Sequence, residues 1–181
     1  MSTGDQSPEL KLGWEEWVSL PELGLPALRA KVDTGARTSS LHATDIETFG
    51  PVNAPRVRFT VHPVPGQEDL LIPCSALIKD RREVTSSNGD SEMRFVIETP
   101  LEVNGSSWPV ELTLTDRRGM ALHMLVGRQA LDQVTVLPSE RFCQPELDYS
   151  VYASAAIRKT APKRALRIAV LSREDNYSTR R

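Results

Sequence analysis

Short apolar runs interrupted by turn residues constrain the fold of this chain most strongly. Thirteen prolines and ten glycines are scattered through its 181 residues. Polar and apolar residues alternate over 56–62, R-V-R-F-T-V-H, which is typical of a half-buried strand. Asn88-Gly89 and Asn104-Gly105 each separate two strand-like runs, and this arrangement is a strong signal for a β-hairpin. The sequence therefore predicts a mainly β fold rather than long helices.

The same pattern gives the expected elements and their order. We expect strands at 14–20, 28–33, 56–62, 69–74, 76–85, 92–99, 101–103, 108–115, 121–126 and 134–137, and one short helix over 128–133. Residues 1–12 are interpreted as a disordered lead, and residues 13–143 as the folded domain. Residues 144–165 turn basic and have no clear period, so they are interpreted as a linker. Residues 166–181 begin with a buried-strand pattern and are interpreted as the truncated start of a second domain.

Composition and charge narrow the class of protein. Hydrophobic residues make up 39% and charged residues 25%, as in soluble globular proteins. The net charge of −2 gives no bulk attraction to nucleic acid or to an anionic membrane. No apolar run approaches the roughly 20 residues of a membrane helix, and the N-terminus has no secretory apolar region. Cys74 and Cys143 have no CxxC spacing, so we expect buried thiols and a cytoplasmic location.

A candidate acid lies in the segment K-V-D-T-G-A-R-T-S-S-L-H-A, residues 31–43. Asp33 follows an apolar strand, and Gly35 has no Cβ to keep backbone N–H groups away from the carboxylate. Thr34 can hydrogen-bond across a symmetric interface. Two such carboxylates side by side share a proton, so one acts as a base on water and the other as an acid. Asp and Gly are also common in ordinary turns, so the alternative that this segment is only a turn stays open at this point.

Three features in order resemble the retroviral-type (retropepsin-like) aspartic peptidases. That family has an apolar residue and Asp-Thr-Gly-Ala after its second strand, here residues 32–36. A flap hairpin follows, for which 76–98 is the candidate, and then two apolar residues, Gly and Arg, here Leu125-Val126-Gly127-Arg128. The resemblance implies a closed β-fold with one short C-terminal helix and a catalytic Asp33-Thr34-Gly35. Since the chain has one such motif, it also implies a homodimer in which two Asp33 side chains meet at the two-fold axis.

Residues 13–142 also resemble a bacterial family labelled "ATP-dependent zinc protease". The motifs are G-W-E-E-W-V-S-L-P-E-L-G, the 31–43 segment, R-R-E-V-T-S-S-N-G, W-P-V-E-L-T-L-T-D-R and M-L-V-G-R-Q-A-L. Its members lie beside, or are fused to, ATP-grasp ligases that add glutamate to ribosomal protein S6. R-I-A-V-L-S-R-E-D-N-Y-S-T-R-R near the C-terminus resembles the first strand of such a ligase. The resemblance implies a peptidase that trims glutamate tails. We expect no cofactor, no membrane and no direct nucleic-acid partner.

The basic residues near the motif and the flap are consistent with an acidic substrate. Arginine is suited to bidentate binding of carboxylates. Classical retropepsins have an acid where this chain has Arg37, so Arg128 either binds an anionic ligand with Arg37 or pairs with another acid such as Asp45. The basic cluster comprises Lys31, Arg37, Arg81, Arg82, Arg94, Arg117, Arg118 and Arg128. The expected substrate-binding residues are Lys31, Ala36, Arg37, His42, Arg81, Arg82, Asn88, Gly89 and Arg128.

Several alternatives remain beside the aspartic peptidase. One is a non-catalytic module that binds acidic tails for the ligase. Another is a zinc-dependent peptidase, for example with His42, His123 and an acid, although the chain lacks H-E-x-x-H and His62 is expected to be exposed. Ser39 and Ser40 lack the elbow pattern of serine nucleophiles. The tryptophans are expected to lie in the core; they are Trp14, Trp17 and Trp108.

Overall fold

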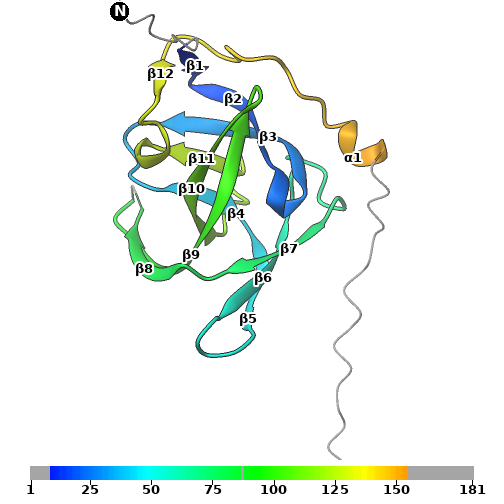
Figure 1. Cartoon of the computed structure of the whole chain (residues 1–181), viewed down its shortest axis with the longest axis vertical. Helices are drawn as coiled ribbons and strands as arrows, with labels where there is room; N and C mark the ends of the chain where they lie inside the picture. The colour runs from blue at the N-terminus through cyan, green and yellow to red at the C-terminus, as the bar shows by residue number, and fades with distance from the viewer. Residues whose placement is uncertain (1–8, 87, 155–181) are drawn as a thin grey trace, which may run out of the picture.

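The computed structural model describes residues 9–86 and 88–154, and this part of the chain is mainly β (Figure 1). The strands are β1 Leu10–Gly13, β2 Glu15–Leu20, β3 Leu25–Asp33, β4 Ser39–His42, β5 Thr44–Phe49, β6 Arg56–Val61, β7 Ile72–Leu77, β8 Asp80–Thr85, β9 Ser91–Val103, β10 Ser106–Thr115, β11 Met124–Gly127 and β12 Val134–Leu137. The helical elements are the 3₁₀ turns η1 Pro21–Leu23 and η2 Arg128–Ala130 and the α-helix α1 Val151–Ser154.

The main sheet closes on itself. Its strand order is β10-β4-β11-β3-β2-β9-β8, and β10 also pairs with β9, so six strands form a ring from which β8 extends. Within the ring β11 runs parallel to β3, and β4 runs parallel to β10. Closure leaves few free strand edges and encloses one apolar core. The predicted fold class, a closed retropepsin-like β-fold with one short C-terminal helix, is confirmed.

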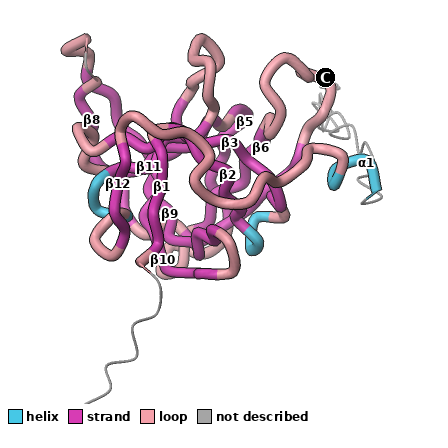
Figure 2. Tube along the Cα trace, turned by 90° about the horizontal axis from the view of Figure 1, so that it is seen from above, coloured by secondary structure: helices cyan, strands magenta, loops and turns pink. Residues whose placement is uncertain are grey.

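Both predicted Asn-Gly hairpins are present. Asn104 and Gly105 have φ values of 48° and 78° and connect β9 to β10, as expected for a two-residue turn with positive φ. Gly89 has a φ of 90° in the turn between β8 and β9, whose pairing begins at Thr85 and Ser91. In Figure 2 the end of the β8–β9 hairpin stands out from the barrel. The long β9 strand therefore connects the barrel to a projecting hairpin.

Several predicted strands have different limits in the structure: those expected over 92–99 and 101–103 form the single strand β9, and the one expected over 69–74 begins only at Ile72. The strand expected over 76–85 is divided: Ala76 in β7 pairs with Val57, whereas Asp80 in β8 pairs with Val96. The strand expected over 121–126 begins only at Met124. The helix expected over 128–133 is limited to the single 3₁₀ turn η2. The sequence pattern thus located these elements but not their ends.

Strands β4 and β5 were not predicted. β4 is short and carries polar residues that are buried, and β5 is largely exposed, so neither has the half-buried alternation used to find strands. β5, β6 and β7 form a separate three-stranded sheet, which lies below the barrel in Figure 1.

The chain on either side of the barrel is more ordered than predicted. The lead expected to be disordered over 1–12 ends in β1, where Leu10 pairs with Val134 of β12. In the predicted linker, Tyr152 of α1 is 4% exposed, and its hydroxyl donates to the carbonyl of Ala27 over 2.6 Å. The interpretation of 144–154 as a solvated linker is therefore corrected. Residues 155–165, and the ligase-like segment 166–181, lie outside the described residues.

Buried carboxylates connect β2 to the segment that follows β12. Glu16 is fully buried and accepts hydrogen bonds from the backbone N–H groups of Gly13, Cys143 and Gln144 over 3.0–3.2 Å. Glu15 is also buried and forms ion pairs with Arg29 and Arg141. Backbone donors and guanidinium groups replace the water that these carboxylates lose on burial. They hold the C-terminal part of the domain against the barrel.

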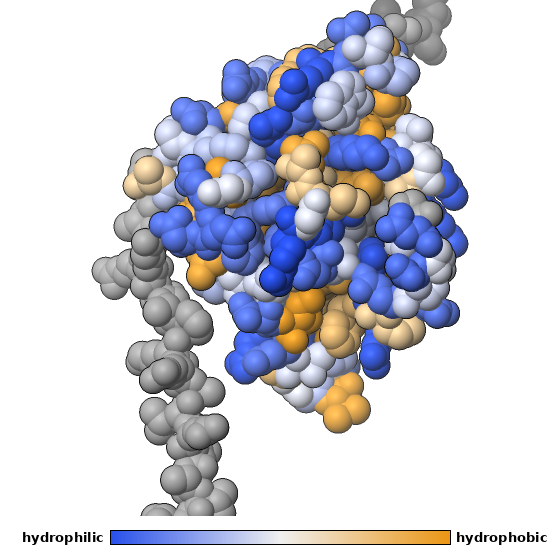
Figure 3. All heavy atoms as spheres, turned by 180° about the vertical axis from the view of Figure 1, so that it is seen from behind, coloured by the Kyte–Doolittle hydropathy of each residue, from blue (hydrophilic) through white to orange (hydrophobic). Residues whose placement is uncertain are grey.

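The tryptophans differ in their burial. Trp17 is 6% exposed, and the half-buried Trp108 donates from its indole nitrogen to the carbonyl of Ala130 over 2.9 Å. Trp14 is 41% exposed and lies beneath the guanidinium of Arg141, so its predicted place in the core is wrong. The face shown in Figure 3 is mostly hydrophilic, with small separate apolar areas. Within residues 9–86 and 88–154, no helix has the length and apolar character needed to cross a membrane.

Candidate active site

Asp33 is the last residue of β3, and the turn after it folds back onto its carboxylate. Oδ1 accepts hydrogen bonds from the backbone N–H groups of Gly35 and Ala36, over 3.0 and 3.2 Å. A Cβ at Gly35 would lie 3.2 Å from Oδ1, which is a tight contact, so a glycine suits this approach. Oδ2 lies 2.9 Å from the ammonium of Lys31. Both carboxylate oxygens therefore have partners within the same chain.

These contacts favour the ionised form of Asp33. The hydrogen bond from Lys31 lowers the pKa of Asp33, and the two backbone donors lower it further, against the opposing effect of partial burial. An ionised carboxylate next to a groove can accept a proton from water. The turn geometry thus fits the base of an aspartic peptidase, although Lys31 is a partner that the sequence reasoning assigned to substrate binding.

The Leu125-Val126-Gly127-Arg128 segment supports the Asp33 turn. β11 pairs with β3 so that Gly127 lies opposite Asp33. The N–H of Gly127 donates to Oγ of Ser39 over 3.0 Å, and that of Arg128 donates to the carbonyl of Ala36 over 2.9 Å. A Cβ at Gly127 would lie 2.6 Å from the backbone of Thr38, which only glycine avoids. The segment around Gly127 therefore lies beside the Asp33 turn and holds the loop that follows Asp33 in place.

Arg128 has a structural contact in the described chain. Its guanidinium donates to the carbonyl of Gly35 over 3.2 Å. Asp45, the acid suggested for it by the sequence, instead accepts a hydrogen bond from the hydroxyl of Thr44. The pairing of Arg128 with Asp45 is therefore wrong, and Arg128 supports the back of the Asp33 turn.

Asp33 opens onto a groove with a volume of about 1020 Å³ between the barrel and the β8–β9 hairpin. Six predicted site residues line it: Lys31, Asp33, Gly35, Ala36, Arg37 and Arg82. Six others do not: Thr34, His42, Arg81, Asn88, Gly89 and Arg128. Arg37 is exposed at the rim. The structure thus brings the motif and part of the hairpin together around one groove.

The hairpin arginines are engaged within the chain. Arg82 forms ion pairs of 2.9 Å with both Asp80 and Glu111. The guanidinium of Arg81 lies 5.6 Å from the ring centre of Phe95, away from the groove. Arg82 is therefore already paired with two carboxylates, and Arg81 lies over Phe95 and does not line the groove.

Sequence reasoning did not select several groove residues on β4 and β10. Ser40, Thr113 and Thr115 line the groove, as does Arg117, which comes two residues after the end of β10. The alternation of Thr113 and Thr115 with apolar residues indicated a strand but not the face that the threonines occupy. Arg117 belonged to the predicted basic cluster without being assigned to the site. Parallel pairing of β10 with β4 brings these residues beside the Asp33 turn.

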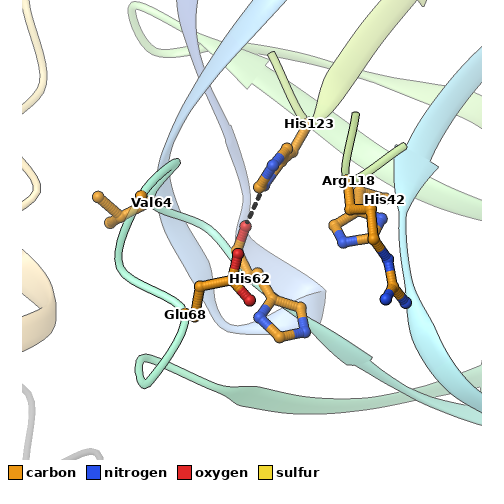
Figure 4. Close-up of a pocket in the computed structure, with 7 residues that line it drawn as sticks. His42, His62, Val64, Glu68, Arg118 and His123 are labelled. Carbon is orange, nitrogen blue, oxygen red and sulfur yellow. Dashed lines mark hydrogen bonds between the residues drawn. The ribbon is translucent and has the colours of Figure 1, made fainter. Parts of the chain in front are cut away.

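The three histidines gather in a second, smaller cavity of about 90 Å³, which Glu68 and Arg118 also line (Figure 4). The ring centres of His42 and His123 are 4.7 Å apart, and those of His42 and His62 are 5.4 Å apart. His62 is half-buried, so its predicted exposure is wrong. Burial lowers the pKa of His42, and the neighbouring His123 and His62 lower it further, whereas Asp116 opposes them.

The donor set of this cavity does not fit zinc. Nδ1 of His42 accepts the backbone N–H of Arg117 over 2.9 Å, so the neutral ring carries its proton on Nε2 and neither nitrogen has a lone pair to offer. Nδ1 of His123 donates to the carbonyl of His62 over 2.8 Å. Among the described residues, no group of three or more His, Cys, Asp or Glu is arranged to hold a metal ion.

The serines near Asp33 are engaged as acceptors. Oγ of Ser39 receives the N–H of Gly127 over 3.0 Å, and Oγ of Ser40 receives the guanidinium of Arg117 over 3.2 Å. A nucleophilic serine needs a base within hydrogen-bond distance of its hydroxyl. Neither hydroxyl has a histidine as its hydrogen-bond partner in the described chain.

Comparisons with known proteins agree with this geometry. A solved structure of a protein of unknown function from Legionella pneumophila has a TM-score of 0.63 and 24% identity, covering 75% of this chain and 98% of that one. At this identity the likeness shows the fold alone. Proteins named "Probable alpha-L-glutamate ligase" are 44% identical over 173 residues in Shewanella pealeana and 39% identical over 172 residues in Desulfotalea psychrophila.

The relatives are longer proteins. Both matches cover 94% of this chain, but only 38% of the Shewanella protein and 37% of the Desulfotalea protein. This chain therefore spans well under half the length of the curated relatives that it matches. The family model described as "Retropepsin-like aspartic endopeptidase RimB" matches residues 11–147, which include the Asp33 turn, the hairpin and β11. The chain therefore belongs to this RimB-like family of retropepsin-like aspartic endopeptidases.

Proposed function

We propose that the chain is an aspartic peptidase that shortens glutamate-rich tails on a protein such as ribosomal protein S6. The observation that carries the proposal is an Asp33 carboxylate, fixed by its own turn, in a groove lined by five basic side chains. These are Lys31, Arg37, Arg82, Arg94 and Arg117; besides Asp33, the groove has two acids, Glu83 and Asp116. Such a groove attracts an anionic peptide. The ligase names of the relatives support a substrate that carries added glutamate.

The second carboxylate of the proposed reaction comes from a second copy of the chain. Thr34 and Gly35 are exposed beside Asp33, so the turn can approach its copy across a two-fold axis. One Asp33 accepts a proton from water as the water oxygen bonds to the amide carbon. The other, protonated, supplies a proton to the leaving nitrogen as the C–N bond breaks, which yields a carboxylic acid and an amine. No metal or cofactor takes part.

Mixing experiments test the shared site. Increasing amounts of the Asp33→Asn chain are added to a fixed amount of wild type, and the release of glutamate from a tailed substrate is followed. Exchange of subunits should lower activity below the dilution control, because each mixed dimer lacks one of its two carboxylates. An activity that depends only on the amount of wild type would contradict a dimeric site.

One observation favours a second function. Lys31 already neutralises Asp33 in the single chain, so the groove also suits a non-catalytic module that holds acidic tails for a glutamate ligase. The relatives named as ligases, which are longer than this chain, are consistent with such a partner, fused or adjacent. This function predicts binding of a polyglutamate peptide with no change in its length during long incubation.

A further inference from the structure

Arg117 is a half-buried arginine of the groove and has no ion pair with an acid among the described residues; Arg37 has none there either, but it is exposed at the rim. Arg82 pairs with Asp80 and Glu111, and Arg94 pairs with Glu92. Arg117 instead donates from one terminal nitrogen to the neutral Oγ of Ser40, over 3.2 Å. Its Nε is buried and has no hydrogen-bond partner among the described residues. A guanidinium that has lost water and gained one weak acceptor still needs an anion.

The surroundings of Arg117 add to this need. Burial lowers the pKa of Arg117, and the positive charge of Arg94 lowers it further, while Asp33 acts in the opposite direction. An arginine stays protonated in proteins despite such effects, so the two guanidinium groups repel each other. The carboxylate of Glu92 forms an ion pair with Arg94 and also accepts a hydrogen bond from the hydroxyl of Thr115. Arg94 and Arg117 together therefore carry two positive charges, of which the carboxylate of Glu92 balances one.

The position of Arg117 is fixed by its backbone. Its N–H donates to Nδ1 of the buried His42 over 2.9 Å, and its guanidinium donates to Oγ of Ser40. Ser40 and His42 lie two residues apart on β4. Residues two apart on a strand share one face, so β4 holds Arg117 at both ends. A preorganised guanidinium loses little conformational freedom when it binds a carboxylate.

We propose that Arg117, with Arg94 beside it, binds the side-chain carboxylate of a substrate glutamate in the groove next to Asp33. This assignment rests on the proposed function and names the group that selects its substrate. A carboxylate can accept two hydrogen bonds from one guanidinium, which gives specificity over the isosteric amide of glutamine. The hairpin arginines Arg81 and Arg82, expected from the sequence to hold the substrate, are already engaged.

The test measures both binding and cleavage for a matched pair of peptides on the full chain. The peptides end in a short glutamate tail, and one has glutamine at a single tail position. Wild type should bind and cleave the all-glutamate peptide better than the peptide with glutamine at the tail position that Arg117 contacts. Arg117→Gln should weaken binding of the glutamate peptide by roughly 10- to 100-fold, the effect of losing a hydrogen bond to a charged group. The same substitution should leave binding of the glutamine peptide nearly unchanged. Arg58→Gln, an exposed arginine of β6 outside the groove, is the control.

Two further arms keep the result interpretable. Arg117→Lys keeps the charge but not the bidentate fork, so it should give an intermediate preference, and it serves if Arg117→Gln does not fold. A C-terminally amidated tail distinguishes the side-chain carboxylate from the terminal one; loss of the preference on amidation alone would overturn the assignment to a side chain.

Failure of the two proposals has different signatures. If no peptide is cleaved while binding still prefers glutamate and needs Arg117, the peptidase proposal fails and the Arg117 assignment stands. If folded Arg117→Gln and Arg117→Lys chains discriminate between the two peptides as wild type does, the Arg117 assignment is overturned. Equal binding of both peptides by wild type at every tail position would overturn it as well.

Discussion

The ammonium of Lys31 lies 2.9 Å from Oδ2 of Asp33, two residues further along the same strand. Alternation along β3 places both side chains on one face, so this ion pair follows from the strand itself. It gives the candidate catalytic carboxylate a cationic partner within its own chain. In the dimer that we propose, Lys31 therefore influences how readily two Asp33 carboxylates share a proton.

Replacement of Lys31 by Met should move the acidic limb of the activity profile to higher pH. Lys31 is the largest of the influences that lower the pKa of Asp33, so its loss raises that pKa, and the carboxylate then becomes protonated at a higher pH. The measurement is kcat/KM against pH for wild type and Lys31→Met. Lys11→Met, at an exposed position on β1, is the control. An acidic limb at the same pH in all three chains would rule out this role of Lys31.

Replacement of Gly127 by Ala should damage both stability and activity. The added Cβ would lie 2.6 Å from the backbone of Thr38, so the loop that carries Asp33 must move. Overpacking of this kind costs about 1–3 kcal/mol in the free energy of unfolding. Gly119→Ala is the matched control because a Cβ there meets no atom within 4 Å. If the two variants unfold at the same denaturant concentration, the close approach at Gly127 is not real.

Replacement of Glu16 by Gln should destabilise the domain although it preserves shape. Glu16 accepts three backbone N–H groups, and the amide of glutamine turns a donor toward one or more of them. The expected loss is about 1.5–3 kcal/mol in the free energy of unfolding, measured by denaturant titration. Glu22→Gln, at an exposed position in η1, should have little effect. Equal stability of the two variants would show that the carboxylate does not hold the 143–144 segment.

His42 should make the protein less stable below about pH 6.5, the ordinary pKa of histidine. Its pKa in the folded protein is lowered by burial, so the unfolded chain takes up a proton first as the pH falls, and the folded state loses stability. Asn at this position can keep an acceptor for the N–H of Arg117 without titrating. Denaturant unfolding at pH 7.5 and 5.5 should show a smaller pH effect in His42→Asn. An identical pH effect in both chains would show that His42 is not its source.

The Asp33 turn and the two hairpins could be predicted because they depend on local residue types. Asn104-Gly105 takes positive φ values that few other residues adopt, and Gly127 meets Thr38 at a distance that only glycine permits. Such requirements leave a signal in the sequence. The fold class followed from these turns and from the family resemblance.

The groove residues could not be predicted because they depend on pairing between distant strands. Arg117 lies at the groove since β10 pairs with β4, and 77 positions separate Arg117 from Ser40. Charge alone did not distinguish Arg117 from Arg82, whose acidic partners lie 2 and 29 positions away. The sequence suggested His42 and His123 together but missed His62 for the same reason, since the three histidines come from separate parts of the chain.

The most direct test of the central claim is mass spectrometry of a glutamate-tailed protein incubated with wild type and with Asp33→Asn, each with and without a metal chelator. If the claim holds, wild type shortens the tail in both conditions, the tail keeps its full length with Asp33→Asn, and both chains have the same thermal stability near neutral pH. Tail shortening that persists in a well-folded Asp33→Asn chain, or that stops when the chelator is added to wild type, would contradict it.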